Sequence, residues 1–222
     1  MEKKYGRITM IVALLIVVAL IGIVVWNQNR IFSIEKSMET TAYSFEGEKV
    51  PLKDVMYYIM MEEDAVNELA LTYDAENPRA YWNLFISGKF VSKLAAQTAC
   101  NYAIRDDLYA KEAEKLGLIL SEEEKQDAKI KAQAIFDGMT EKQLNATHLT
   151  VEQITAICEQ RTLVNNLCVH LAKERELEIE EDVLQKYYGL ESKYFDELQE
   201  TYKVVINKSL WNNISLGAVT IN

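Results

Sequence analysis

Residues 8–26 read ITMIVALLIVVALIGIVVW, a run of 19 residues in which no side chain is charged and only Thr9 is polar. An α-helix rises about 1.5 Å per residue, so this run covers most of a hydrocarbon core about 30 Å thick. A helix also satisfies its own backbone hydrogen bonds in lipid, where water is absent. The run therefore predicts a transmembrane helix that fixes the rest of the chain to a membrane.

Three other kinds of N-terminal segment share some features with this run. A cleavable signal peptide has a shorter apolar region and then a small-x-small site, and residues 24–30, VVWNQNR, offer none. A bacterial lipoprotein needs a cysteine directly after the run, but the first cysteine is Cys100. A pilin-like leader is suggested by Gly6, but pilins usually carry a glutamate five residues later, where Ile11 stands. The sequence favours an uncleaved signal anchor.

Basic residues lie mainly before the run. Lys3, Lys4 and Arg7 precede it, whereas only Arg30 follows closely. By the positive-inside rule, the short N-terminal tail stays in the cytoplasm and residues 31–222 lie outside it. We therefore expect a single-pass cell-membrane protein in which everything up to Arg30 is cytoplasmic tail and signal anchor.

The composition of the remaining part of the chain limits its fold class and its partners. Residues 31–222 carry 20 basic and 33 acidic side chains, so we expect no binding to nucleic acid. The chain has only two prolines and eight glycines, and Glu, Lys, Ala and Leu are abundant. This composition favours helix over a strand-rich fold. The length suits one domain with a sizeable core.

Apolar residues at helical spacing predict helices over most of this domain. Ser121 followed by Glu124 is a capping box, and Gly117 suits the end of the preceding helix. Segments around Phe45 and over 202–207 are extended in character, and we expect them to pair with each other. The predicted helices are 51–73, 89–116, 121–137, 140–147, 150–173 and 180–198.

These segments define the predicted domain organisation. Residues 31–44 mix polar and apolar side chains without a clear period and are interpreted as a linker. Residues 45–222 are predicted to form a mainly α domain in which a small two-stranded β element joins the two ends. The whole chain is thus a transmembrane helix followed by one helical domain.

The helix predicted over 51–73 has two apolar faces. Seven residues fall within about 100° of arc and form a core stripe, interrupted by Glu62. They are Leu52, Val55, Ile59, Val66, Leu69, Ala70 and Tyr73. A second patch lies on the otherwise polar side and consists of Met56, Tyr57, Met60 and Met61. Methionine-rich surfaces accept many apolar sequences, so the patch is a candidate peptide-binding surface. The alternative is a helix buried on both sides.

An aromatic group follows that helix. Tyr81, Trp82 and Phe85 lie close in sequence. Such a group is either a core anchor or a binding site. We include Trp82 and Phe85 with the four residues of the patch as candidate peptide-binding residues.

No catalytic or metal-binding pattern appears. His148 and His170 are isolated from any cysteine or carboxylate pattern, and no nucleotide-binding, zinc-protease or nucleophile motif is present. The three cysteines form no disulfide framework and are predicted to be buried free thiols. We therefore predict no enzymatic activity, no cofactor and no metal.

Three stretches together resemble the N-terminal helical domain of the SurA/PrsA family of extracytoplasmic chaperones and foldases. They are FEGEKVPL at 45–52, DLYAKEAEKLGLILSEEE at 107–124 and LEIEEDVLQKYY at 177–188. Each alone is a generic capped helix or turn, and their order and spacing carry the resemblance, which covers about 43–210. In that family a parvulin isomerase domain of some ninety residues usually follows the Tyr-Tyr helix. Only 34 residues follow Tyr188 here.

The resemblance implies a chaperone module and a membrane tether without the isomerase. On this basis we expect a membrane-anchored extracytoplasmic protein that binds unfolded or translocated polypeptides without catalysis. Two alternatives remain at this point: an adaptor that holds one specific partner at the membrane, and a degenerate prolyl isomerase.

Overall fold

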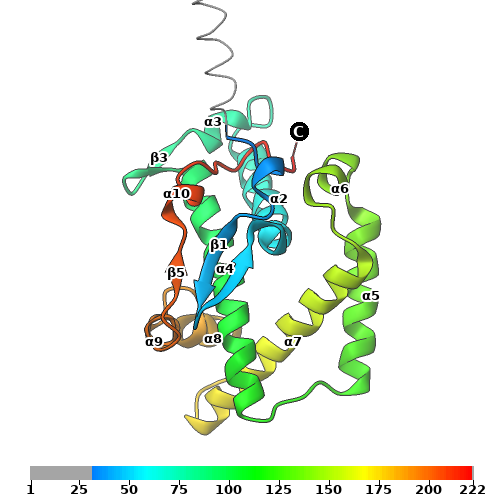
Figure 1. Cartoon of the computed structure of the whole chain (residues 1–222), viewed down its shortest axis with the longest axis vertical. Helices are drawn as coiled ribbons and strands as arrows, with labels where there is room; N and C mark the ends of the chain where they lie inside the picture. Colours follow the sequence, from blue (N-terminus) through cyan, green and yellow to red (C-terminus); the bar gives the residue numbers. More distant parts are fainter. Residues whose placement is uncertain (1–31, 222) are drawn as a thin grey trace, which may run out of the picture. The chain divides into compact units, whose positions relative to one another are not determined.

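The computed structural model describes residues 32–221. The transmembrane helix predicted over 8–26 lies outside these residues. From Ile34 onward the chain forms one compact unit (Figure 1). It is mainly helical, as the sequence predicted for the domain, and has two small antiparallel sheets where the sequence predicted one. Among the described residues, no helix combines the length and apolarity needed to cross a membrane.

The two ends of this unit meet in a three-stranded antiparallel sheet with the order β2–β1–β5. Its strands are β1 (Thr41–Phe45), β2 (Glu48–Pro51) and β5 (Val205–Ile206). Tyr43 lies opposite Ile206, so the predicted pairing of the two ends is confirmed. The sheet has three strands rather than two, because Glu46 and Gly47 adopt positive φ and turn the chain into a hairpin. Pro51 ends a strand instead of entering a helix.

Ordered structure begins earlier in the chain than expected. The short helix η1 (Glu35–Ser37) and most of β1 fall within 31–44, the predicted linker. Tyr43 is 1% exposed, and its hydroxyl donates a hydrogen bond to Asp107 Oδ2 at 2.7 Å. The linker boundary is therefore corrected, since β1 is an internal strand whose side chains belong to the core.

A short 3₁₀ helix, η2 (Leu52–Val55), leads into α2 (Met56–Tyr73). Of the predicted core stripe, four residues are fully buried: Leu52, Val55, Ile59 and Ala70. Leu69 and Tyr73 are instead 55% and 57% exposed. Tyr73 contacts Tyr81 of the one-turn helix that follows the Asp74–Pro78 break, with ring centroids 5.6 Å apart, and this contact leaves Tyr73 largely exposed.

A β-hairpin precedes the long helix α4 (Val91–Lys115). It consists of β3 (Phe85–Ile86) and β4 (Lys89–Phe90), where the sequence predicted the first turn of that helix. Ser87 and Gly88 have φ of 50° and 83°, which is the backbone of a two-residue hairpin turn. The helix therefore starts two residues later than predicted.

Capped helices build the rest of the core, as predicted. They are α5 (Glu122–Gly138), α6 (Glu141–Thr147) and α7 (Val151–Glu174). Each begins with a reciprocal capping box, at Ser121, Thr140 and Thr150 respectively. Gly117, with φ of 69°, ends α4. Helix α7 packs against both α4 and α5 (Figure 1).

The helix predicted over 180–198 is two helices, α8 (Glu181–Tyr188) and α9 (Lys193–Thr201). A Cβ on Gly189 would lie 2.3 Å from the carbonyl oxygen of Gln185, so only glycine fits there. Ser192 then caps α9 by accepting a hydrogen bond from a backbone N–H. These two residues break the helix that the apolar spacing suggested.

After α10 (Lys208–Trp211), the chain runs without regular structure over 212–221, a segment we name the C-terminal strap. Glu63 of α2 is fully buried and holds this strap. Its carboxylate accepts hydrogen bonds of 2.5–3.0 Å from the backbone N–H groups of residues 217–220 and from the Thr220 hydroxyl. One side chain thus fastens the end of the described chain to its centre.

The strap also packs on α3 (Arg79–Trp82). Gly217 has φ of 107° and lies flat against the indole of Trp82. A Cβ there would approach Trp82 Cδ2 to 2.7 Å. The buried indole is thus covered by backbone, which only glycine at this position permits.

Candidate functional site

Three of the six candidate peptide-binding residues lie together in the core on α2. Met56, Tyr57 and Met60 are 0%, 1% and 1% exposed. Helix α4 packs along α2, and Arg161 of α7 donates to the Tyr57 hydroxyl at 3.3 Å. The structure therefore corrects the prediction of an open groove at these residues, because α2 is covered on both apolar faces.

The other three candidates are separated from one another. Trp82 is 4% exposed and lies beneath the C-terminal strap. Met61 is 37% exposed, at the edge of the α2 core face. Phe85 is 65% exposed and packs edge-to-face on Phe90, with ring centroids 5.3 Å apart. The predicted aromatic group is therefore divided between a core anchor, Trp82, and an exposed hairpin.

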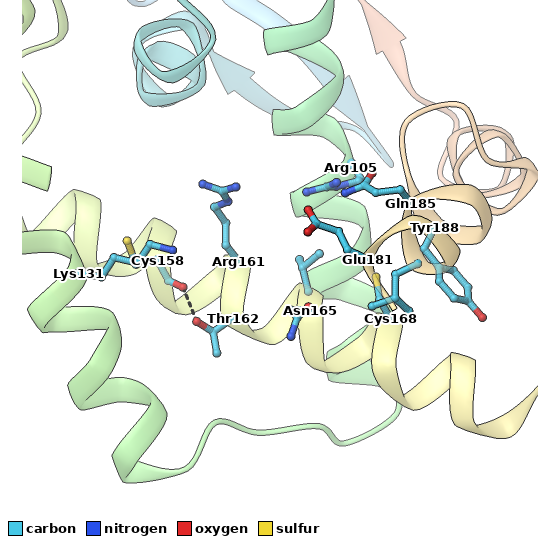
Figure 2. A pocket seen from close by; sticks show the side chains of 12 residues that line it. Arg105, Lys131, Cys158, Arg161, Thr162, Asn165, Cys168, Glu181, Gln185 and Tyr188 are labelled. Carbon is cyan, nitrogen blue, oxygen red and sulfur yellow. Dashed lines mark hydrogen bonds between the residues drawn. The ribbon is translucent and has the colours of Figure 1, made fainter. Parts of the chain in front are cut away.

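A polar hollow of about 530 Å³ opens between α4, α5, α7 and α8 (Figure 2). Arg105, Lys131 and Arg161 line it, together with Glu181. Behind it, fully buried Asp106 accepts hydrogen bonds from Arg105 Nε and Nη2 at 3.0 and 2.7 Å. Arg161 Nε lies 3.7 Å from the same carboxylate. Both guanidinium groups are thus engaged, and the hollow is a polar joint between helices.

Asp107, next to Asp106 in α4, links these helices to strand β1. Asp107 accepts from the Tyr43 hydroxyl and, at 2.9 Å, from Gln160 Nε2 of α7. Tyr58 of α2 donates to Asp106 at 3.1 Å. Burial raises the pKa of both tyrosines and of Asp107. These groups fasten β1, α2, α4 and α7 together, and each has its partner within the chain.

The described residues offer little for covalent or metal chemistry. Cys100, Cys158 and Cys168 are buried free thiols, as predicted. Burial raises the pKa of Cys168 to about 11, so its nucleophilic thiolate is scarce at neutral pH. In the part of the chain that the structure describes, no three His, Cys, Asp or Glu side chains converge on a metal position. His170 lies 3.5 Å from Glu174 on the same helix.

A second hollow, of about 480 Å³, lies between α4, β5 and α10, next to β4. We name it the lysine hollow. Its lining combines apolar groups, three side-chain amides and three lysines. The lining residues are Lys89, Lys93, Gln97, Cys100, Asn101, Ile206, Lys208, Trp211 and Asn212. Trp211 is 8% exposed, and its indole N–H donates to the carbonyl of Ala42, so the apolar wall is fixed.

The three lysines keep their positive charge unneutralised. Lys93 Nζ donates to the backbone carbonyls of Asn212 and Ile214 at 2.8 and 2.7 Å, and Lys89 donates to the Gln97 amide at 2.6 Å. Within the described part of the chain, neither these two nor Lys208 forms an ion pair with a carboxylate. Desolvation lowers the pKa of Lys93. The hollow thus presents cations beside an apolar wall.

This local charge contrasts with the domain as a whole. No acidic residue occurs between Glu76 and Asp106 or after Glu200. We name these two stretches the acid-free segments. They supply the β3–β4 hairpin, the first half of α4, β5, α10 and the C-terminal strap. Their basic residues are Arg79, Lys89, Lys93, Arg105, Lys203 and Lys208.

The sequence reasoning missed the lysine hollow because it counted charge over the whole domain. A count along the chain shows both acid-free segments. The predicted pairing joins the region of Phe45 to 202–207, whereas the acid-free segments meet through other contacts, among them the hydrogen bonds from Lys93 to the carbonyls of Asn212 and Ile214. The signal was therefore present, but the hairpin at residues 85–90 and the turn of α10 were not foreseen.

Comparisons with known proteins assign neither a family nor a function to the chain. No model of a protein family matches the chain, and neither the curated proteins nor the solved structures give a match. Function is therefore argued from the chain's own sequence and geometry.

Proposed function

We propose that this chain is a membrane-anchored, non-catalytic polypeptide-binding protein. Residues 8–26 would hold it in the membrane with its domain outside the cytoplasm, and the lysine hollow would take extended segments of unfolded or translocated polypeptides. The three stretches that resemble the SurA/PrsA helical domain support this proposal. The observation that carries it is the lysine hollow.

The lining of the hollow suits an extended peptide. Ile206 and Trp211 offer an apolar surface for one side chain. The amides of Asn101 and Asn212 carry both donors and acceptors, which match the groups of a peptide backbone. Strand β5 is an edge of the three-stranded sheet, and an edge can accept a further strand.

The cations of the hollow favour acidic clients. Lys89 and Lys208 line the hollow without a carboxylate partner among the described residues. Acidic side chains or a C-terminal carboxylate of the client would supply that partner. Over the rest of the domain acidic residues outnumber basic ones, and they would repel such a client.

Binding of a permanently unfolded acidic polypeptide tests the proposal. We suggest reduced, carboxymethylated α-lactalbumin as the probe and the full chain in detergent micelles as the protein. The double variant Lys89→Glu, Lys208→Glu should raise the dissociation constant about tenfold or more, as expected for like charges placed across an interface. Both lysines are at the surface, so the melting temperature should change little.

The matched control is Lys129→Glu on α5, an exposed lysine outside the hollow. It should leave the affinity nearly unchanged. Equal effects of the two variants, or no binding by the unaltered chain, would contradict the proposal. An adaptor would bind one partner only, so binding of several unrelated unfolded polypeptides separates a chaperone-like protein from an adaptor.

A further inference from the structure

The β3–β4 hairpin, residues 85–90, presents a large apolar surface. We name it the aromatic hairpin. Phe85, Ile86 and Phe90 are 65%, 44% and 50% exposed. The two rings contact each other edge-to-face and leave their outer faces open. Exposed apolar groups that adjoin in this way indicate a surface with a partner.

The geometry of the hairpin places this surface at a tip. Its two strands pair only with each other and form a sheet of their own. A Cβ built on Gly88, in the turn, meets no atom within 4 Å. Within the described residues, the tip therefore projects into open space.

We propose that the aromatic hairpin inserts its tip into the headgroup layer of the bilayer that holds residues 8–26. The proposal depends on the predicted membrane anchor and does not depend on polypeptide binding. Aromatic and branched apolar side chains beside lysine are the composition of segments that lie in a membrane interface.

The length of the tether supports a bilayer as the partner. Only eight residues separate Trp26, the last residue of the apolar run, from Glu35 at the start of η1. Fully extended, they span about 30 Å at most. In Figure 1 the dark-blue start of the described chain, α3 and β3 lie toward one end of the compact unit, and α8 and α9 lie toward the other. Within the compact unit, the hairpin is thus at the same end as η1, the first element of the unit.

Charge complementarity points the same way. The hairpin belongs to an acid-free segment, contains Lys89 and is flanked by Arg79 and Lys93. Each basic residue near an anionic membrane surface adds to the attraction. The acidic remainder of the domain would be repelled by the same surface, so one orientation is selected.

The test places a reporter at the tip of the hairpin in the full chain. Ser87→Cys is labelled with an environment-sensitive fluorophore, and the chain is reconstituted into vesicles of phosphatidylcholine and phosphatidylglycerol. The three native thiols are buried and stay unlabelled under native conditions. Lipids that carry a nitroxide near the headgroup should quench the label at residue 87 and shift its emission to the blue.

Glu123→Cys provides the matched control, since it is exposed at the start of α5, toward the other end of the unit in Figure 1. Its label should be neither quenched nor shifted. The double variant Phe85→Ser, Phe90→Ser should remove most of the quenching at residue 87. Both side chains are half-exposed or more, so the fold should persist, as circular dichroism would verify.

Three results would overturn the proposal. One is quenching at residue 87 no greater than at residue 123. Another is quenching that survives loss of both phenylalanines, or that an added unfolded polypeptide abolishes, since the hairpin would then serve a client. The third is a chain that fails to sediment with the vesicles, because the anchor itself would then be absent.

Discussion

Glu63 is a charged side chain that solvent does not reach. A buried carboxylate is tolerated only when hydrogen bonds replace its hydration. Here four backbone N–H groups and the Thr220 hydroxyl do so, and all of them come from the C-terminal strap. Backbone donors recognise the carboxylate whatever the side chains of the strap are, so this attachment depends on Glu63 more than on the strap sequence.

Glu63→Gln tests this attachment. The variant keeps the shape of the side chain but replaces one carboxylate oxygen with an NH₂ group, so the backbone N–H of Thr220 loses its acceptor if the remaining oxygen serves residues 217–219. Each unsatisfied buried group costs about 1–3 kcal/mol, so we expect the free energy of unfolding to fall by at least about 1 kcal/mol. Urea denaturation of the full chain in detergent, followed by circular dichroism, measures the loss.

The neighbouring residue provides the control. Glu62 makes no hydrogen bond or ion pair among the described residues and is only partly buried. Glu62→Gln leaves no donor without an acceptor, so it should not lower the free energy of unfolding near pH 7. A loss in Glu63→Gln no larger than in Glu62→Gln would show that the strap does not rely on the carboxylate.

Glu62 also predicts a pH dependence of stability. Burial raises its pKa from 4.5 to about 7. Between these two values the folded chain binds more protons than the unfolded chain, so this residue lowers the free energy of unfolding as pH rises. Unfolding of the unaltered chain and of Glu62→Gln at pH 5, 6, 7 and 8 isolates the effect. The unaltered chain should lose stability relative to the variant across this range, and a constant difference would refute the raised pKa.

At the scale of elements, helices with strong local signals were predicted well. The capping boxes at Ser121 and Thr150 and the terminal Gly117 fix helix boundaries through backbone hydrogen bonds that nearby residues supply. The hairpin at Ser87–Gly88 and the break at Gly189 were missed. Their signals are one or two residues long, and the apolar spacing around them continues a helical period.

The candidate site could be predicted only in part. Exposure of Phe85 is a property of the hairpin, and burial of Met56 and Met60 results from packing by α4 and other distant elements. A helix with two apolar faces is equally consistent with a core helix and with a binding helix, and only the tertiary fold distinguishes them. The lysine hollow is lined by residues more than a hundred positions apart in the chain, so patterns in short stretches of sequence do not reveal it.

The contact between the strap and α3 gives a prediction about an element. Gly217→Ala and Gly117→Ala both place a Cβ at positive φ, which costs about 1–2 kcal/mol. At Gly117 the Cβ enters open space, whereas at Gly217 it meets the Trp82 indole at 2.7 Å. Gly217→Ala should therefore be the more destabilising, by urea denaturation, and should shift the fluorescence of the tryptophans. Equal losses would show that the strap can move away from Trp82 freely.

At the scale of the whole molecule, the sequence predicts a definite orientation in the membrane. By the positive-inside rule, Lys3, Lys4 and Arg7 predict that the domain lies outside the cytoplasm. A fluorescent reporter that matures only in the cytoplasm should stay dark when fused after Asn222, while alkaline phosphatase fused there should be active. A fluorescent reporter and an inactive phosphatase after Asn222 would show the reverse orientation. As a control, the same reporters fused before Met1 should give the opposite result, with bright fluorescence and no phosphatase activity.

The attachment of the strap to Glu63 has a consequence for synthesis. The donors for Glu63 lie more than 150 positions further along the chain, and β5 likewise follows its partner β1 late. A nascent chain that has emerged only as far as α9 lacks both. The domain therefore cannot close before residues 217–220 have been made, and a product that terminates earlier would expose an uncompensated carboxylate and an unpaired strand. Proteases that act on incompletely made chains would find such a product open.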